Sequence, residues 1–302
     1  MVTQCDIQNA VRALQLTGHA LCVHASLRSF GWVEGGAQTV VDALLAEGCT
    51  VLTPTFTEYG VPPPPELRPA RNGWDYDHFT QDWPDIGKIY TPATNEVDPV
   101  EMSAISAAVA QMPERIRGNH PLCSFAAVGP LTHALIAGQA PLNVNAPLTA
   151  LAAMDGFVVL MGVGLDKMTL LHLAEQHAGR NLFRRWANGP DGQIIDVETG
   201  GCSDGFGKLE SVLAPLMQQL TVGQSHWRVL PAKRALAIAA EAIRREPQIT
   251  HCGQACERCD DAVLGGPLVY TKGAVIRDQL KHTTLLTDNG SLKNLTTSNF
   301  MA

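Results

Sequence analysis

Residues 157–175 read FVVLMGVGLDKMTLLHLAE, and this stretch decides the fold of the chain. It opens with an apolar run, as in a strand that is buried on both faces. Gly162 and Gly164 then let the backbone turn tightly, and Thr169 is placed to cap the helix that follows. This order of strand, glycine turn and helix predicts an α/β sheet, which holds its sites at the carboxyl ends of its strands.

The helix within this stretch carries a histidine and a carboxylate on one face. His172 and Glu175 lie three positions apart, so their side chains can hydrogen-bond. A carboxylate beside an imidazole fixes the tautomer and raises the basicity of the ring, which prepares it to act as a general base. An ordinary surface ion pair has the same spacing, and the spacing alone leaves both interpretations open.

The composition indicates a globular enzyme and excludes several other classes of protein. The chain has 302 residues, of which 45% are hydrophobic and 17% charged, and its formal net charge is −7. This balance gives no basic surface for nucleic acid and disfavours anionic membranes, whereas it suits a cationic substrate. With neither a signal-peptide pattern nor an apolar run of transmembrane length, we expect a cytoplasmic protein. We find no repeat or linker and expect a single domain over residues 1–302.

A second strand–loop–helix unit lies near the start of the chain. Residues 20–24 predict a buried strand, 37–46 a helix and 50–57 a second strand, which together predict a right-handed parallel βαβ unit. Hydrophobic periodicity over the rest of the chain predicts further helices over 103–112, 131–137, 148–154, 206–219 and 232–245, with strands over 124–128 and 227–230.

The loop inside this unit reads ASLRSFGWVEGG from Ala25 to Gly36 and leads into a helix N-terminus. Backbone N–H groups and the helix dipole at such a position can bind an anion, and Ser26, Arg28 and Ser29 could add donors to phosphate. The spacing matches neither a P-loop nor a dinucleotide fingerprint. An anion site and an ordinary glycine turn therefore remain equally compatible with it.

Residues 58–98 break the regular pattern with a long irregular excursion. Segments of this length inside a domain are usually functional or mobile. Aromatic and acidic side chains alternate in it, so it forms either a wall of a substrate cleft or a loop anchored by its rings; they are Trp74, Asp75, Tyr76, Asp77, Asp82, Trp83 and Asp85.

Several short motifs, in a fixed order, together resemble the aminoglycoside 3-N-acetyltransferase family. They cover roughly the first 190 residues, and the resemblance depends on their order rather than on one motif. The motifs are His24-Ala25-Ser26-Leu27, Gly31-Trp32-Val33-Glu34-Gly35-Gly36 with Thr39, Pro54-Thr55-Phe56, Asn119-His120-Pro121, Ser124 to Pro130, and Leu160 to Gly164 continuing through Asp166, Thr169, His172 and Glu175.

This resemblance implies a compact α/β fold, a mixed-sheet sandwich with helices on both faces, unlike the common acetyltransferase fold. It implies transfer of an acetyl group from acetyl-coenzyme A to an amine, the 3-amino group of an aminoglycoside-type antibiotic. By likeness His172 is the general base that Glu175 orients, and Asp166, His120 and Thr55 contact the acceptor. The expected coenzyme A site comprises Ser26, Leu27, Arg28, Ser29, Val33, Gly35 and Gly36.

The chain departs from the family pattern in ways that affect the acceptor more than the reaction. Ser103 stands where the family usually has glycine, and the segment between Tyr59 and Ile89 is individual to this chain. Two alternatives therefore stay open: a biosynthetic acyltransferase that acts on a different small amine, and a non-catalytic relative that binds coenzyme A. We expect no nucleic-acid or membrane partner, and the sequence leaves the oligomeric state open.

A cysteine-rich segment occupies residues 246–265 of the domain. Cys252, Cys256 and Cys259 are spaced C-x3-C-x2-C, and His251 precedes them. This spacing predicts a structural zinc site with three thiolates and a fourth ligand, either His251 or a residue from elsewhere in the chain. An iron–sulfur cluster and unliganded thiols in a reduced cell are the two alternatives.

Overall fold

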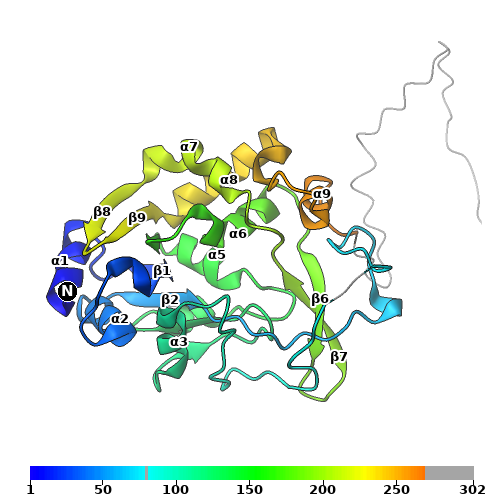
Figure 1. Ribbon diagram of the computed structural model, residues 1–302, viewed down its shortest axis with the longest axis horizontal. Helices are drawn as coiled ribbons and strands as arrows, with labels where there is room; N and C mark the ends of the chain where they lie inside the picture. The colour runs from blue at the N-terminus through cyan, green and yellow to red at the C-terminus, as the bar shows by residue number, and fades with distance from the viewer. Residues whose placement is uncertain (79–80, 269–302) are drawn as a thin grey trace, which may run out of the picture. The chain divides into compact units, whose positions relative to one another are not determined.

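The computed structural model describes residues 1–78 and 81–268, and a seven-stranded mixed sheet lies at its centre (Figure 1). The strands follow the order β3-β4-β2-β1-β5-β9-β8. Their bounds are β1 (Ala20–Ala25), β2 (Thr50–Pro54), β3 (Ile116–Arg117), β4 (Phe125–Val128), β5 (Phe157–Met161), β8 (Gln218–Val222) and β9 (Ser225–Pro231).

The middle of the sheet is parallel and its two sides are antiparallel. Strand β1 pairs in parallel with β2 on one side and with β5 on the other, so the parallel βαβ unit expected near the start of the chain is confirmed. Strands β4, β3, β9 and β8 add in antiparallel pairs. The carboxyl ends of β1, β2 and β5 therefore meet at one edge of the sheet, where an α/β fold places its site.

Helices cover both faces of this sheet (Figure 1). Their bounds are α1 (Gln4–Ala13), α2 (Gly36–Ala46), α3 (Ala104–Gln111), α4 (Thr132–Ile136), α5 (Ala146–Ala153), α6 (Leu170–His177), α7 (Glu210–Leu213), α8 (Ala232–Arg245) and α9 (Glu257–Val263).

Alternation along the strands divides the core into two layers. In β5, Val158 and Leu160 pack with α4, α5, α6 and α8, whereas Val159 and Met161 pack with α1, α2 and α3. Successive side chains of a strand point to opposite faces, so an entirely apolar strand must be covered on both sides. The expected mixed-sheet sandwich with helices on both faces is confirmed.

The turn after β5 has the geometry that its glycines predict. Gly162 has a φ of 68°, a region that side chains other than glycine rarely adopt. A Cβ at Gly162 would also overlap the Ser29 hydroxyl. Thr169 is the N-cap residue of α6, as expected, but its side chain makes no capping hydrogen bond. Its hydroxyl lies 3.4 Å from His24 Nε2 instead.

The helix expected over 206–219 is wrong in its last part. Short 3-10 and α-helical turns run from Phe206 to Leu216, and Gln218–Val222 forms strand β8. This strand is at the edge of the sheet and pairs only with β9. An edge strand does not need the apolar pattern of a central one, so its polar residues gave no strand signal.

A separate antiparallel hairpin, β6 (Phe183–Asn188) with β7 (Ile194–Thr199), stands apart from the central sheet (Figure 1). Residues Met1–Leu268 form one compact unit. The expected single domain over 1–302 also includes residues 269–302, which lie outside the described residues. No helix within the described ranges has the length and apolar character needed to cross a membrane.

Candidate active site

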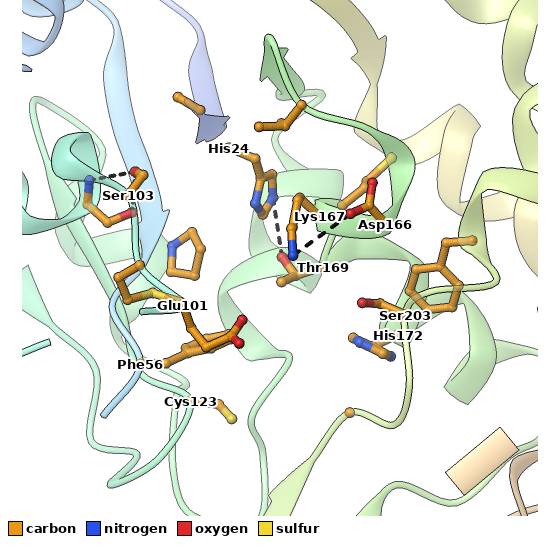
Figure 2. Close-up of a pocket in the computed structure, with 18 of the residues that line it drawn as sticks. His24, Phe56, Glu101, Ser103, Cys123, Asp166, Lys167, Thr169, His172 and Ser203 are labelled. Atoms are coloured by element: carbon orange, nitrogen blue, oxygen red, sulfur yellow. Dashed lines mark hydrogen bonds and ion pairs between the residues drawn. The ribbon is translucent and has the colours of Figure 1, made fainter. Parts of the chain in front are cut away.

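A cleft of about 780 Å³ opens at the carboxyl edge of the parallel strands (Figure 2). His24 reaches it from β1, Pro54 from β2, and Val163 from the turn after β5. Helix α6 contributes His172, and the segment after β7 contributes residues 199–204. The cleft thus lies where the strand order predicts a site.

His172 and Glu175 form the expected pair in the wall of this cleft. Nδ1 of His172 lies 2.9 Å from Oε2 of Glu175, and both side chains are largely shielded from solvent, at 15% and 8% exposure. An ionised carboxylate can only accept, so Nδ1 donates and the neutral ring keeps its lone pair on Nε2. Within the described part of the chain no protein group hydrogen-bonds to Nε2.

Arg180 also contacts Glu175, although no pattern in the sequence pointed to this residue. Its Nη1 donates to Oε1 of Glu175 at 2.6 Å and to the Thr250 hydroxyl at 2.7 Å. Both charged side chains are buried. Each carboxylate oxygen therefore has its own donor: Oε2 accepts a hydrogen bond from His172, and Oε1 accepts one from Arg180. This arrangement fixes the carboxylate plane, and with it the tilt of the imidazole.

Phe206 and Gly200 also pack against the His172 ring. The Phe206 ring lies with its centroid 4.8 Å from the imidazole centroid. On the segment that follows β7, a Cβ added to Gly200 would come within 2.5 Å of His172 Cδ2. Gly200 therefore allows the backbone to approach the ring as closely as it does. The imidazole is held by packing as well as by its hydrogen bond.

A second histidine in the cleft is electrically neutral. His24 is the second-last residue of β1 and is buried, and burial lowers the pKa of its imidazole to about 4. Its Nε2 lies 3.4 Å from the Thr169 hydroxyl and 3.5 Å from Cys22 Sγ. Removal of the charged form from water is unfavourable here because no carboxylate compensates it. His24 offers the cleft a neutral polar group.

Of the three residues expected to contact the acceptor, only Asp166 lies in the cleft. It is partly exposed, and Lys167 Nζ lies 3.8 Å from its Oδ2. His120 is fully buried: Nε2 lies 2.8 Å from Glu198 O, and Nδ1 accepts from Cys123 N at 2.8 Å. Thr55 is also fully buried and bonds to Ser124. The placement of these last two in the cleft is corrected, since both act within the core.

The residues expected to bind coenzyme A divide into two groups. Ser26, Leu27 and Arg28 line the cleft, but the remaining four do not. The Ser29 hydroxyl donates to Ser26 O at 2.7 Å and lies 2.8 Å from Ser225 Oγ, so it is used within the protein. Val33 is buried and bridges to Val2, and Gly35 and Gly36 form the turn into α2 with positive φ. These four residues shape the loop in this structure, and their contact with coenzyme A stays a prediction.

A smaller cavity of about 340 Å³ adjoins the cleft and shares several of its walls. The acidic residues in its lining are Glu58, Asp82, Asp98 and Glu101, and burial together with the charges of Asp98 and Asp85 raises the pKa of Glu58. Glu101 reaches into the cleft from the side opposite His172 (Figure 2). Several carboxylates in the lining of a cavity favour a cationic ligand.

Aromatic residues of the excursion both anchor the segment and line this cavity. Trp74 lies 6.3 Å from Trp83 and 6.2 Å from Trp186, centroid to centroid. Trp74 and Trp83 also line the cavity. The excursion is thus both anchored by its rings and part of the wall of a cavity. Of its four acids noted in the sequence, only Asp82 is in the lining.

Two arginines, Arg185 and Arg258, also line the smaller cavity. Arg185 stacks on Trp74, with its guanidinium carbon 3.6 Å from the ring centroid, and burial together with the charge of Arg258 lowers its pKa to about 9. Arg258 lines both cavities. Neither arginine was predicted from the sequence as a site residue.

The cysteine-rich segment lies beside the cleft, and its fourth partner is not His251. Cys202 joins Cys252, Cys256 and Cys259, and the four sulfur atoms lie within 4.8 Å of one another. Nε2 of His251 lies 3.0 Å from Asp260 Oδ1, and its Nδ1 accepts a hydrogen bond from the Gly253 N–H at 2.9 Å. The expected ligand His251 is therefore replaced in the cluster by Cys202.

A family model of the aminoglycoside 3-N-acetyltransferases matches residues 22–244 of this chain. The chain belongs to the aminoglycoside 3-N-acetyltransferase family. Its fold also matches the crystal structure of aminoglycoside acetyltransferase AAC(3)-IVa in the apo form. The TM-score is 0.69 at 27% identity, and the match covers 87% of this chain and 98% of the other.

Sequence comparison gives family relatives at about one third identity. The chain is 33% identical to aminoglycoside N(3)-acetyltransferase VIII of Streptomyces fradiae over 165 residues, 53% of this chain and 56% of that protein. It is 34% identical over 188 residues to the SPbeta prophage-derived aminoglycoside N(3')-acetyltransferase-like protein YokD of Bacillus subtilis, 57% and 64% respectively. The aligned region thus spans less than two thirds of each relative.

Proposed function

We propose that this chain is an N-acetyltransferase that moves the acetyl group of acetyl-coenzyme A to an amine of an aminoglycoside-type acceptor, at its 3-amino group. One observation carries the proposal: His172 has its Nδ1 fixed by Glu175 and its Nε2 free at the cleft. Family membership supports the reaction class. AAC(3)-IVa, in a histidine-to-alanine mutant, was crystallised with a gentamicin, which supports an acceptor of this type.

The chemistry needs a base, because an ammonium group has no lone pair with which to attack. An ammonium acceptor therefore gives one proton to water first, and His172 Nε2 then removes a second proton from the neutral amine as its nitrogen bonds to the thioester carbonyl carbon. The C–S bond then breaks, and the imidazolium returns its proton to the departing coenzyme A thiolate. The Glu175 carboxylate stabilises the imidazolium while it exists, since it lies 2.9 Å from Nδ1 in a shielded site.

The acceptor would enter beside the acidic residues that line the two cavities. Glu101 and Asp166 line the main cleft, and Glu58 and Asp98 line the adjoining cavity. An aminoglycoside carries several ammonium groups, so carboxylates that face the cavity hold it in place and raise its local concentration. The formal net charge of −7 acts in the same direction.

Acetyl-coenzyme A would lie along the loop that follows β1. Ser26 and Leu27 line the cleft there, and the Arg28 guanidinium supplies a cation for the phosphates. AAC-IIIb, which at 22% identity shares the fold with this chain, was solved as a binary complex with CoASH. That complex describes AAC-IIIb, and it supports coenzyme A as the donor to test here.

A specific observation favours a second candidate acceptor. Arg185 and Arg258 line the adjoining cavity, and Arg258 also reaches the main cleft. Two cations on that wall would repel a further ammonium group, whereas they would attract a carboxylate or phosphate. An amine that bears one anionic group is therefore the alternative acceptor, as in a biosynthetic acyltransferase.

An acceptor panel tests the proposal and separates it from its alternatives. Thiol release from acetyl-coenzyme A is followed with a kanamycin-type and a gentamicin-type aminoglycoside, a simple diamine, and an amine with a carboxylate or phosphate. Reaction without acceptor is the blank, since the free thiols of the protein also react. The proposal expects turnover with the aminoglycosides and, by product NMR, acetylation of the 3-amino group.

Each other result of this panel contradicts part of the proposal. Turnover only with the anionic amine would establish the second candidate and overturn the aminoglycoside assignment. Coenzyme A binding by calorimetry without turnover on any amine would indicate a non-catalytic relative. Acetylation at a different amino group would retain the reaction and overturn its regiochemistry.

A further inference from the structure

Four cysteines from three places in the chain converge beside the cleft. Cys202 follows the β6–β7 hairpin, Cys252 precedes a turn, and Cys256 and Cys259 belong to the start of α9. Their sulfur atoms all lie within 4.8 Å of one another. All four are free thiols in this structure, so disulfide bonding does not account for their approach.

The spacing of the sulfur atoms suits one tetrahedral metal ion. Zinc–sulfur bonds of about 2.3 Å place the corners of a tetrahedron about 3.8 Å apart. Cys202 and Cys259 are buried, and the other two are half-buried, so the cluster is partly shielded from water. The Cys252 N–H points to Cys259 Sγ at 3.4 Å, a donor that suits a thiolate more than a thiol.

We propose that Cys202, Cys252, Cys256 and Cys259 bind one zinc ion as a closed tetrathiolate, and that this ion holds the wall of the cleft next to His172. Four protein ligands leave no position for water or substrate, so the ion is structural. The metal site itself does not rest on the proposed reaction. The family match ends at residue 244, before three of the four ligands.

The segment that carries Cys202 forms part of the cleft. Residues 199–204 line it, and Gly200 packs against the His172 ring. A Cβ at Gly205 would overlap the carbonyl oxygen of Thr250, so this segment runs directly against the one that leads to Cys252. Lys208 Nζ also donates to His251 O at 2.7 Å. The ion would lock two segments that already touch.

The helix that carries Cys259 also contributes to the wall of the cleft. Arg258, which lines both cavities, stands between the ligands Cys256 and Cys259. Asp261 Oδ2 accepts from the Gly73 N–H at 2.7 Å and so ties α9 to the long excursion. An ion bound by Cys256 and Cys259 would therefore fix the backbone position of Arg258, a cationic residue of the cleft wall.

The protein has little else with which to hold this segment. Between Glu246 and Cys259 only Thr250 and Cys259 are buried, and Ile249 is the one apolar side chain there that packs in part against the core. Thr250 in turn bonds to Arg180, the partner of Glu175. A structural zinc ion supplies folding free energy in such a place.

Metal analysis of the untagged, full-length protein, with variants at two positions, tests this inference. We expect about one zinc per chain in a closed site, released as a mercurial reagent titrates the cluster thiols. Cys202→Ser should lose most of the zinc, and its melting temperature should fall. Cys5→Ser, an exposed cysteine on α1, and His251→Gln should both retain the metal.

The inference is overturned if the protein binds no zinc and its cluster thiols react freely in the folded state. Iron in place of zinc would overturn it as well. Zinc that survives Cys202→Ser and is lost in His251→Gln would overturn the ligand assignment. If Cys202→Ser does not fold, the absorption spectrum of the cobalt-substituted wild-type protein decides, because a tetrathiolate site differs from one with three sulfurs and a nitrogen.

None of these readouts depends on turnover, so failure of the proposed reaction would leave the metal result intact. A kinetic measurement connects the two. If the ion holds the cleft wall, a Cys202→Ser variant that still folds should show a larger increase in KM for the amine than for acetyl-coenzyme A, relative to wild type. Equal increases in both KM values would reject the wall as the place where the ion acts.

Discussion

Arg180 and Glu175 form a buried ion pair, with Nη1 2.6 Å from Oε1, and this pair stands directly behind the imidazole of His172. The guanidinium also donates to Thr250 Oγ1 and to Pro247 O. The carboxylate that orients His172 is thereby linked to the segment that leads into the cysteine cluster. Stability and activity are therefore coupled at this point of the fold.

Arg180→Met should destabilise the protein by about 3–5 kcal/mol, because the Glu175 charge would stay buried without its cation. Urea denaturation at neutral pH measures this cost. Adding Glu175→Gln to Arg180→Met should restore part of the stability, while turnover remains low because the imidazole has lost its carboxylate. A single-variant cost below about 1 kcal/mol, the range of exposed pairs, would show that the pair is not buried in solution.

Gly200→Ala should reduce kcat far more than it reduces stability. The new methyl group would come within 2.5 Å of the His172 ring, so the ring would have to move. Even a small displacement of a catalytic group lowers the reaction rate strongly. Gly207→Ala is the matched control, since nothing lies within 4 Å of a Cβ there. Equal kcat values for the two variants would mean that the segment after β7 does not restrain the ring.

Protein stability should fall as the pH is lowered from about 6.5 towards 4. Burial lowers the pKa of His24 and of His120 to about 4, so the unfolded chain binds more protons in this range. The neutral rings contribute fully to the free energy of unfolding above the unfolded pKa of about 6.5. This contribution is lost as the pH falls towards the folded pKa and the buried rings become protonated.

His120→Asn isolates one of these contributions. Asparagine can still donate to Glu198 O and accept from the backbone, but it does not titrate. The dependence of unfolding free energy on pH should therefore become shallower, by at most about 1.4 kcal/mol per pH unit. Parallel curves for the variant and the wild type between pH 6 and pH 4.5 would show that His120 is not buried as a neutral ring.

Arg28→Ala should raise the KM for acetyl-coenzyme A and leave the KM for the amine nearly unchanged. Arg28 lines the cleft on the loop where we place the coenzyme phosphates, and a charge-assisted hydrogen bond contributes about 1.5–3 kcal/mol. Arg234→Ala, an exposed arginine on α8, controls for net charge. An increase in both KM values would place the coenzyme elsewhere.

The sheet and its helices could be predicted because their sequences are locally consistent. The run from Phe157 to Met161 must be covered on both faces, and helix α8 was expected with the same bounds as observed, Ala232–Arg245, because its apolar stripe is regular. The His172–Glu175 hydrogen bond followed from helical spacing alone. Such features depend on residues that are close in the sequence.

The remaining parts of the site depend on contacts between distant segments, which no local pattern contains. Arg180 meets Thr250 across 70 positions, and Cys202 joins cysteines about fifty positions further on. His120 and Thr55 belong to motifs of the family, but a motif does not distinguish a residue that lines a cleft from one that supports it. His120 lies in the core because its ring satisfies backbone groups there.

The rate of acetyl transfer by His172→Ala tests the central claim most directly. His177→Ala is the matched control, because His177 is exposed at the end of the same helix. With acetyl-coenzyme A and a gentamicin-type acceptor, we expect kcat of His172→Ala to fall by about 10²–10⁴. Coenzyme A affinity by calorimetry and melting temperature should stay near wild type. A folded His172→Ala protein that acetylates the acceptor as fast as His177→Ala would contradict the account.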